Sequence, residues 1–320
     1  MMKRVDFKHP EFFAGITSLK YTASGVVPQR LPQAAIDFCT ALEDVKGARA
    51  RGGAGVRLAV YTDTKKLSVK LRILSKNADN CIMTLIDSTG KCEHRQFTEN
   101  TELNWDLPEN NDKITLFFPW QAEIEIIDVL ISSGAYFHPA LEVSPRKLIF
   151  IGDSITQGME SAYPEKSYAA LVAQKLGIDF HNCGVGGLRM EPEFVQKSLC
   201  GAFDIAFLAF GVNDASLKTP LPLFAENCRR SLEILTGSMV KKIFMLLPLY
   251  WPDEDTPGIL DEYRDILRDS ARDFRNIEII DGKRLLPHDR KYFADGVHPN
   301  ADGMEIIAKN ICNFIADKQV

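Results

Sequence analysis

The feature that most constrains the fold is a change in the spacing of apolar residues near Pro145. Before this point apolar and polar residues alternate, as they do at Leu67, Val69, Leu71 and Ile73. A period of two residues indicates strands with one buried face. After this point, short continuous apolar runs alternate with segments of helical periodicity, which is typical of a parallel sheet covered by helices on both faces.

Residues 1–145 are expected to form an all-β sandwich, roughly the size of a jelly roll, that acts as an accessory domain. Polar turns at 75–80 and 108–112 separate its predicted strands, and residues 32–45 form the one possible helix of three turns. The predicted strands cover 67–73, 81–85, 114–118 and 124–131. A length of 320 residues also favours two domains over one.

Residues 146–320 are expected to form a catalytic α/β domain in which strands and helices alternate along the chain. The predicted strands cover 147–151, 179–182, 205–210, 242–247 and 277–280. The predicted helices cover 167–176, 192–199, 221–235, 260–274 and 302–316.

Composition narrows the class of partner and the compartment. The formal net charge of -5 gives no reason to expect nucleic acid or an anionic membrane as a partner. No apolar stretch reaches the length of roughly 18 residues that a membrane span needs, and no signal peptide is visible, so we expect a cytoplasmic protein. Seven scattered cysteines without a C-x-x-C pair are interpreted as reduced packing residues: Cys39, Cys81, Cys92, Cys183, Cys200, Cys228 and Cys312.

Unusual polar residues follow the predicted strands of the second domain one after another. Ser154 follows the first strand, residues 184–187 the second, residues 211–214 the third, and Asp295 and His298 lie in the connection after the fifth. Ligands of doubly wound sheets bind beyond the carboxyl ends of the strands. We therefore expect these four loops to converge on one edge of the sheet.

The chemistry of these residues points to acyl transfer. A serine hydroxyl needs a base to become a nucleophile, and His298 is the natural candidate, with Asp295 accepting the other ring N–H. The backbone N–H of Gly187, the side-chain amide of Asn213 and the backbone N–H of Ser154 are candidate donors to an oxyanion.

In these motifs the second half of the chain resembles the SGNH (GDSL-type) hydrolase family. The resemblance is carried by four blocks: Gly152-Asp153-Ser154 with Ile155-Thr156-Gln157-Gly158, Asn182 to Gly187, Gly211-Val212-Asn213-Asp214, and Asp295-Gly296-Val297-His298. It implies a three-layer α/β/α, flavodoxin-like domain with a parallel sheet. It also implies Ser154 as nucleophile, Gly187 and Asn213 as oxyanion-hole donors, and His298 oriented by Asp295.

The first half resembles, more weakly, the β-sandwich domain that precedes the SGNH domain in some carbohydrate esterases and acyl esterases or transferases. The matching segments are Arg30-Leu31-Pro32, Ala54 to Leu58 with Thr62-Asp63, and Phe118-Pro119 before Glu123-Ile124-Glu125. This resemblance implies the domain layout and favours acylated sugars or glycosides as substrates.

Each motif has a simpler interpretation. A lone Gly-Asp-Ser after a strand is usually a turn, and only its occurrence in order with the other three blocks favours catalysis. Asp153 is expected to cap the following helix and stays outside the catalytic set. The glycines of 184–187 do not complete a dinucleotide-binding motif, because that motif needs a glycine at position 189, which is Arg189. Asp295 and His298 lack the third ligand that a zinc site would need. No cofactor or metal is therefore expected.

Substrate contacts are predicted less sharply. Tyr250 and Trp251 follow the fourth predicted strand and either stack on a sugar ring or acyl group or merely pack their loop. The leading hypothesis is a serine esterase that removes a small acyl group, preferably acetyl, from a carbohydrate or glycoside. The alternatives are an acyltransferase with the same triad and an alcohol acceptor, or a carbohydrate-binding protein. The sequence leaves the oligomeric state open.

Overall fold

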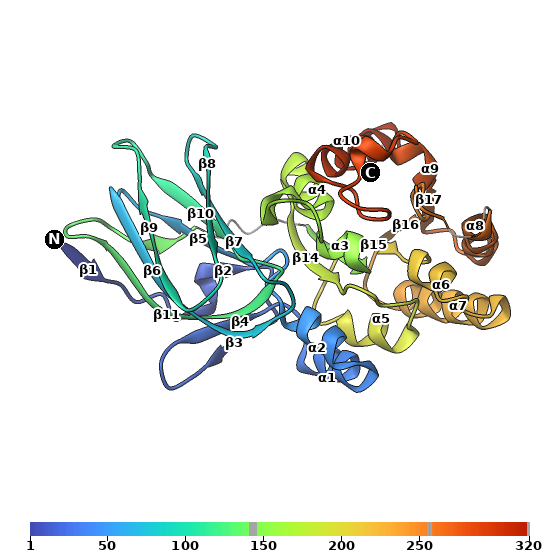
Figure 1. Ribbon diagram of the computed structural model, residues 1–320, viewed down its shortest axis with the longest axis horizontal. Helices are drawn as coiled ribbons and strands as arrows, with labels where there is room; N and C mark the ends of the chain where they lie inside the picture. Colours follow the sequence, from blue (N-terminus) through green and yellow to red (C-terminus); the bar gives the residue numbers. More distant parts are fainter. Residues whose placement is uncertain (141–145, 255, 257, 319–320) are drawn as a thin grey trace.

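Two antiparallel sheets pack face to face in the first part of the chain, at the left of Figure 1. The structure is a computed structural model and describes residues 1–140, 146–254, 256 and 258–318. The first sheet has the strand order β3-β4-β11-β6-β9 with β1 beside β11, and the second has β12-β5-β10-β7-β8 with β2 beside β5. Inward-facing residues such as Val69 and Leu71 of β6 and Leu58 and Val60 of β5 fill the core between the sheets. The predicted sandwich is confirmed.

The strands of the sandwich are short except for β6 and β11, which run side by side along the first sheet. The strands of that sheet are β1 (Met2–Arg4), β3 (Ser18–Tyr21), β4 (Val26–Gln29), β6 (Lys66–Lys76), β9 (Thr101–Asp106) and β11 (Ala122–Ser132). Those of the second are β2 (Phe13–Ala14), β5 (Arg57–Tyr61), β7 (Cys81–Asp87), β8 (Cys92–Phe97), β10 (Lys113–Phe117) and β12 (His138–Pro139).

The third sheet is entirely parallel and has the strand order β14-β13-β15-β16-β17. Its strands are β13 (Lys147–Gly152), β14 (Asp179–Gly184), β15 (Ile205–Ala209), β16 (Lys242–Leu246) and β17 (Ile277–Ile280). This is the flavodoxin-like order. After β14 is added on one side of β13, the later strands are added on the other side, beginning with β15. The predicted parallel sheet is confirmed, and its reversal point is where a ligand site is expected.

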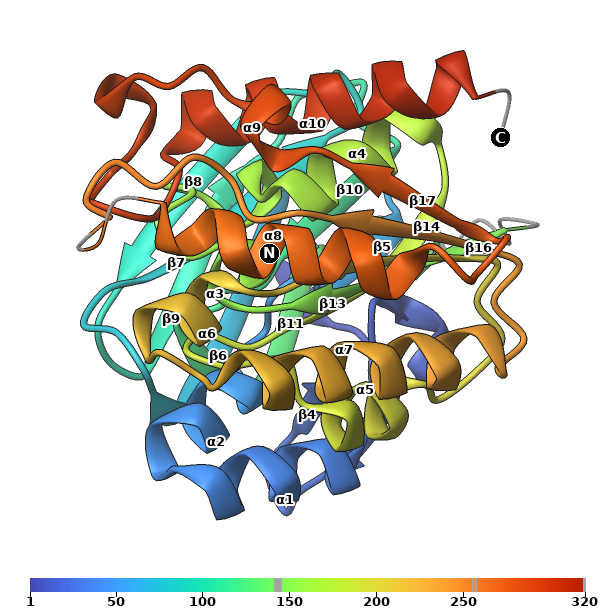
Figure 2. The same ribbon diagram turned by 90° about the vertical axis from the view of Figure 1, so that its right-hand side faces the viewer.

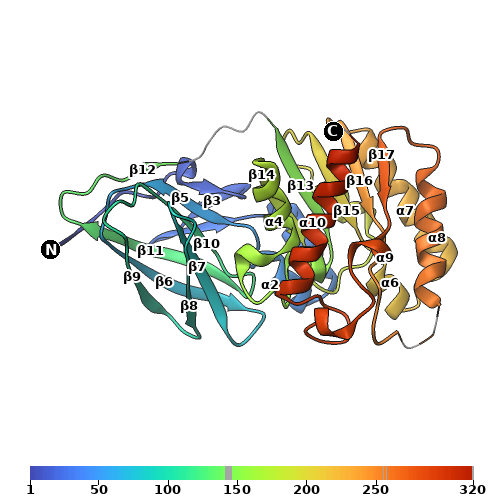
Figure 3. The same ribbon diagram turned by 90° about the horizontal axis from the view of Figure 1, so that it is seen from above.

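Helices cover both faces of the parallel sheet (Figures 2 and 3). Ile149 and Ile151 of β13 belong to one core with α5, α7 and α8, and Leu148 and Phe150 belong to the other with α4 and α10. The helices are α4 (Tyr168–Leu176), α5 (Pro192–Ser198), α6 (Val212–Ser216), α7 (Leu221–Thr236), α8 (Ile259–Ala271), α9 (Gly282–Leu285) and α10 (Ala301–Asp317), besides the short α3 (Ser154–Gln157). Single 3-10 turns lie at η1 (Pro10–Phe12), η2 (Pro164–Lys166) and η3 (Arg290–Tyr292).

The helical segment of the first half differs from the prediction for 32–45. It forms two helices, α1 (Gln33–Leu42) and α2 (Asp44–Arg51), because Glu43 between them is extended, with φ of -170°. Ala35, Ile36 and Cys39 of α1 pack into the core of the parallel sheet, and α1 contacts α5 (Figure 2). The proposed domain boundary at residue 145 lies outside the described residues. Although α1 and α2 belong to the first half of the chain, both contribute buried side chains to the core of the parallel sheet.

Polar contacts also join the sandwich to the parallel sheet. Arg57 of β5 lies 2.6 Å from the Asp179 carboxylate of β14, and its guanidinium stacks over the ring of Phe180, 4.2 Å from the centroid. His94 of β8 stacks on Tyr163, with 3.5 Å between ring centroids. These contacts fix the sandwich against the side of the sheet that carries β14.

Of the seven cysteines, Cys92 and Cys200 are exposed, so the interpretation of all seven as packing residues was wrong for these two. Cys39, Cys81, Cys183 and Cys228 are buried, and Cys312 is partly exposed. Within the described residues, none of the helices has the length and apolar character needed to cross a lipid bilayer.

Candidate active site

Ser154 begins α3, directly after β13 at the carboxyl edge of the parallel sheet. The Asp153 carboxylate accepts the Ile155 N–H at 3.0 Å and so caps this helix, as its position suggested. Gly158 ends the helix in the left-handed region, with φ of 90°. The sharp strand-to-helix turn leaves the Ser154 side chain at the end of the strand, and Ser154 is only 6% exposed.

His298 and Asp295 lie in a tight loop between η3 and α10. A bridge between Phe293 and Pro299 closes this loop, and the Asp295 carboxylate accepts the backbone N–H groups of Val297 and His298, each at 2.7 Å. The other Asp295 oxygen lies 2.7 Å from His298 Nδ1, and His298 Nε2 lies 2.8 Å from Ser154 Oγ. The structure therefore brings the three predicted residues into one continuous hydrogen-bonded chain.

The Asp295 carboxylate is stabilised in its charged form. Partial burial raises its pKa, but the His298 backbone, the His298 ring and the Val297 N–H together lower the pKa of Asp295 below its ordinary value. A charged carboxylate at His298 Nδ1 holds a proton on that nitrogen and leaves Nε2 as the acceptor that faces Ser154.

The predicted oxyanion donors lie in the loops after β14 and β15. Gly187 has φ of 77°, a conformation that side chains rarely adopt. The Asn213 side-chain amide donates one N–H to the Leu188 carbonyl oxygen at 3.0 Å, and this bond ties the two loops together. Its second N–H forms no further hydrogen bond within the described residues. As the first residue of α3, Ser154 also has a backbone N–H with no acceptor inside the helix.

Close packing explains why glycine occupies the end of β14. A Cβ atom on Gly184 would lie 2.2 Å from the Gln157 backbone nitrogen, a distance that no side chain tolerates. The Asn182 side chain fixes the same turn, because its amide donates to the Thr156 carbonyl at 2.7 Å and accepts the Gly184 N–H at 2.9 Å. The loop that carries Gly187 is thereby held against α3.

Residues 150–306 match the model of the GDSL-like lipase/acylhydrolase family. These residues carry a GDSL-like lipase/acylhydrolase domain. The resemblance predicted from the four sequence blocks is therefore confirmed for this part of the chain. No curated protein is similar to the chain in sequence at a significant level.

Solved structures share the fold of the whole chain. The salicylyl-acyltransferase SsfX3 from a tetracycline biosynthetic pathway is 20% identical, with a TM-score of 0.84, and the match covers 100% of this chain and 98% of that one. The acetyl xylan esterase Est2A from the rumen bacterium Butyrivibrio proteoclasticus is 13% identical, with a TM-score of 0.66 and coverage of 100% and 98%. A family two carbohydrate esterase from Clostridium thermocellum, in complex with cellohexaose, is 15% identical, with a TM-score of 0.67 and coverage of 84% and 93%.

At these identities the likeness concerns the fold alone. It shows that a β-sandwich followed by an SGNH domain is an arrangement found in other proteins, as the weaker resemblance of the first half implied. The roles of individual residues in the GDSL-like domain rest on the geometry of this chain.

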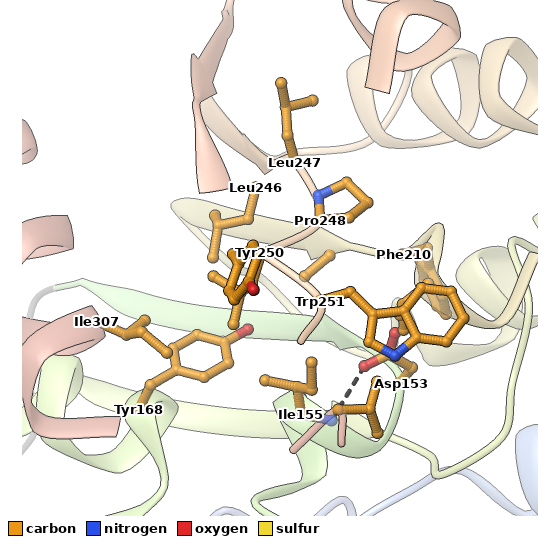
Figure 4. A pocket seen from close by; sticks show the side chains of 14 residues that line it. Asp153, Ile155, Tyr168, Phe210, Leu246, Leu247, Pro248, Tyr250, Trp251 and Ile307 are labelled. Carbon is orange, nitrogen blue, oxygen red and sulfur yellow. Dashed lines mark hydrogen bonds between the residues drawn. The ribbon is translucent and has the colours of Figure 1, made fainter. Parts of the chain in front are cut away.

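Tyr250 and Trp251 line a small cavity of about 40 Å³ (Figure 4). Sequence neighbours of the triad and of Asn213 line the same cavity: Asp153, Ile155, Val212 and Val297. The Tyr250 ring stacks on His288, with 4.5 Å between centroids, and meets Phe293 edge-on. One face of Tyr250 is therefore covered by protein, whereas a role for either side chain in substrate binding stays a prediction.

Two further carboxyl groups of the GDSL-like domain are buried near the triad. Burial raises the pKa of Asp153 to about 7, although the Ile155 N–H and the nearby His298 oppose this shift. Burial likewise raises the pKa of Asp214 to about 6, against the opposing hydrogen bond from the Met190 N–H. The three aspartates of the site thus differ in their affinity for a proton: hydrogen bonds lower the pKa of Asp295, whereas burial makes Asp153 and Asp214 take up protons at a higher pH than an ordinary aspartate.

Sequence reasoning missed Arg49 of α2 and gave no role to Gln157. Arg49 Nη1 donates to the Gly186 carbonyl oxygen at 3.1 Å, so a residue of the first half touches the loop of the predicted oxyanion donor. Gln157 was part of the first sequence block, and this position was the only signal available for it. Nothing in the sequence around Arg49 marks it.

The described residues hold no group of three or more histidine, cysteine, aspartate and glutamate side chains that could bind a metal ion. The absence of a metal or cofactor requirement stays a prediction.

Proposed function

We propose that the chain is a serine esterase that acts through an acyl-enzyme intermediate. The observation that carries the proposal is the chain of two hydrogen bonds, 2.8 Å from Ser154 Oγ to His298 Nε2 and 2.7 Å from His298 Nδ1 to Asp295. A nucleophile, a base and an orienting carboxylate in this order form the constellation that activates a hydroxyl for acyl transfer.

In the proposed reaction Ser154 Oγ attacks the ester carbonyl carbon while its proton passes to His298 Nε2. The Asp295 carboxylate stabilises the imidazolium that forms. The carbonyl oxygen becomes an oxyanion, which accepts hydrogen bonds from the Gly187 and Ser154 backbone N–H groups and from the Asn213 amide. His298 then protonates the departing alcohol, and a water molecule deprotonated by His298 releases the acid.

The preferred substrate is a small acyl ester, with acetyl the first choice. The small cavity lined by sequence neighbours of the triad, Asp153, Ile155 and Val297, has room for about three water-sized groups, close to the size of an acetyl group. Two structural relatives are a carbohydrate esterase and an acetyl xylan esterase, which supports a sugar or glycoside as the alcohol portion.

A groove beside the triad loop supports a bulky alcohol portion. Its volume is about 580 Å³, and it lies between the sandwich and the SGNH domain. Trp120 and Gln121 line it from the sandwich, and Glu160, Ala294 and Asn300 line it from the catalytic side.

Acyl transfer to an alcohol acceptor is the second candidate. It is favoured by the likeness over the whole chain to a salicylyl-acyltransferase. Both reactions share the acyl-enzyme and differ only in whether water or an alcohol attacks it. A domain serving only to bind carbohydrate would not require the assembled triad, so we do not favour this alternative.

The test is hydrolysis of p-nitrophenyl esters from acetyl to long acyl chains by the wild-type chain and by Ser154→Ala. We expect wild-type activity to fall with chain length and Ser154→Ala to lose about 10⁶-fold in kcat while keeping the wild-type melting temperature. Adding an alcohol acceptor and analysing the products separates hydrolysis from transfer. Equal activity in a folded Ser154→Ala variant would overturn the proposal.

A further inference from the structure

The peptide group between Gly186 and Gly187 contacts the first half of the chain. Its N–H belongs to Gly187 and is the proposed oxyanion donor. Its carbonyl oxygen, on Gly186, accepts a hydrogen bond from Arg49 Nη1 of α2 at 3.1 Å. A cationic side chain is therefore bonded to the opposite end of the amide that faces the reacting carbonyl.

Three hydrogen bonds close a ring around this peptide. The Gln157 side chain, which is 1% exposed, donates to the Arg49 carbonyl at 2.9 Å and accepts the Gly186 N–H at 2.8 Å. With the bond from Arg49 to the Gly186 carbonyl, the ring connects α2, the nucleophile helix α3 and the loop after β14. The orientation of the Gly187 N–H thus depends on α2.

Within the described part of the chain, no acid neutralises the Arg49 charge. No carboxylate there forms an ion pair with Arg49, and its buried Nε has no hydrogen-bond partner. Lys46, one turn earlier on α2, is paired with Glu43 at 3.1 Å. A Cβ atom on Gly187 would lie 3.0 Å from Arg49 Nη1, so the guanidinium touches the oxyanion loop directly.

Arg30 fixes the position of this part of α2. Its guanidinium, on a residue that is 1% exposed, donates to the carbonyls of Arg49 at 2.9 Å, Gly52 at 2.6 Å and Asn182 at 2.8 Å. The first two carbonyls lie at the end of α2 and the third lies on β14. The helix end and the strand that leads to Gly187 are therefore joined by one buried side chain.

We infer that Arg49 is a positioning residue of the oxyanion hole, supplied by the N-terminal half of the chain. A cation bonded to a carbonyl oxygen draws electron density from the amide and makes its N–H a stronger donor. This effect is largest when negative charge develops on the reacting oxygen, so it acts on kcat rather than on substrate binding. The inference rests on the proposed acyl-transfer function.

The experiment compares wild type, Arg49→Met, Arg49→Lys, Arg49→Ala for rescue by added guanidinium, and the control Arg51→Met. Arg51 is a second cation on α2, 3.5 Å from Glu123. Two rates are measured: hydrolysis of p-nitrophenyl acetate, and covalent labelling by a fluorophosphonate followed by mass spectrometry. In labelling, Ser154 Oγ bonds to phosphorus, fluoride departs and His298 takes the serine proton, so both rates depend on the oxyanion donors.

We expect both rates to fall about 10- to 100-fold in Arg49→Met with KM nearly unchanged, and Arg49→Lys to recover part of the loss. Guanidinium ion added to Arg49→Ala is expected to restore several-fold activity and to leave wild type unaffected. Arg51→Met is expected to match wild type. Rescue by a free cation is a response that a purely structural role would not give.

Wild-type rates in Arg49→Met, a change confined to KM, or failure of both lysine and guanidinium to restore activity would overturn the inference. Melting temperatures show whether each variant is folded. If Arg49→Met is unfolded, Arg49→Lys is compared with Arg49→Gln. Both side chains keep an N–H donor, but only lysine keeps the positive charge. Equal rates in these two variants would overturn the inference. A wild-type protein that neither hydrolyses esters nor labels Ser154 overturns the proposed function first, and the inference with it.

Discussion

The two sides of the reacting serine are built from different parts of the chain. On the proton-transfer side, Ser154, His298 and Asp295 all come from loops at the edge of the parallel sheet, and their hydrogen bonds need no residue of the sandwich. On the charge-stabilising side, the peptide before Gly187 is bonded to Arg49, which lies 137 residues earlier than Gly186. In the proposed mechanism, proton transfer is therefore local, whereas the electrostatics of the transition state depends on how the two halves dock.

After Ser154→Ala, the largest effect is expected from Asp295→Asn, on the proton-transfer side. An amide at this position favours the wrong tautomer of His298, so kcat should fall on the order of 10⁴-fold with KM nearly unchanged. Steady-state kinetics with p-nitrophenyl acetate measure the change. Asp289→Asn is the control, since Asp289 caps η3 through the Lys291 N–H and should keep full activity.

Comparable kcat losses in Asp295→Asn and Asp289→Asn would show that these changes disturb the loop between η3 and α10 rather than the tautomer of His298. The Asp295 carboxylate keeps its charge below the ordinary pKa of an aspartate, because its hydrogen bonds lower its pKa, so the acceptor at His298 Nδ1 is present throughout the neutral range.

The second effect concerns stability and separates the two kinds of carboxyl group in the site. Burial raises the pKa of Asp153 from 3.8 to about 7, so between these values the folded protein binds a proton that the unfolded chain has lost. The free energy of unfolding therefore falls as pH rises through this window, by on the order of 4 kcal/mol in all. Asp153→Asn stays neutral and should still cap α3.

Urea denaturation of wild type and Asp153→Asn at several pH values between 4 and 8 tests this expectation. The variant should gain stability over wild type as the pH rises, and the shared contributions of all other groups cancel in the difference. Stability curves that run parallel across this range would contradict the raised pKa.

The third effect is on the charge-stabilising side. Asn213→Ala removes one proposed oxyanion donor and should lower kcat by about 10²- to 10³-fold with little change in KM. The matched control is Asn310→Ala, because Asn310 also donates to a backbone carbonyl, that of Leu285 at 3.0 Å, but lies on α10. Loss through KM alone, or an equal loss in the control, would rule out an oxyanion contact.

The sequence predicted the proton-transfer side well and the charge-stabilising side only in part. The five predicted strands and five predicted helices of the second half end within about one helical turn of their predicted ends, because their apolar patterns are local, whereas the short helices α3, α6 and α9 were not predicted. Ser154, Asp295 and His298 could be grouped because the carboxyl ends of parallel strands share one edge. These predictions required no knowledge of the sandwich.

Contacts between the halves could not be predicted in the same way. The break at Glu43 and the packing of α1 on the parallel sheet depend on tertiary contacts that override the local pattern of residues 32–45. An arginine on a short polar helix looks like a solvated surface residue, so Arg49 carried no signal. The exposure of Cys92 and Cys200 was likewise set by the surroundings rather than by residue type.

The smallest effect tests whether the ring around the oxyanion peptide acts as a unit. Gln157→Leu keeps the volume of the side chain but leaves the Gly186 N–H without its partner and removes one of the donors to the Arg49 carbonyl, so kcat should fall by about 3- to 10-fold. A double-mutant cycle with Arg49→Met provides the measurement. If the two residues hold the same peptide, the double variant should lose less than the product of the single losses, since the second change removes support already lost. A loss in the double variant equal to the product of the two single losses would show that Gln157 and Arg49 act separately. The oxyanion loop would then depend on the first half of the chain through Arg49 alone.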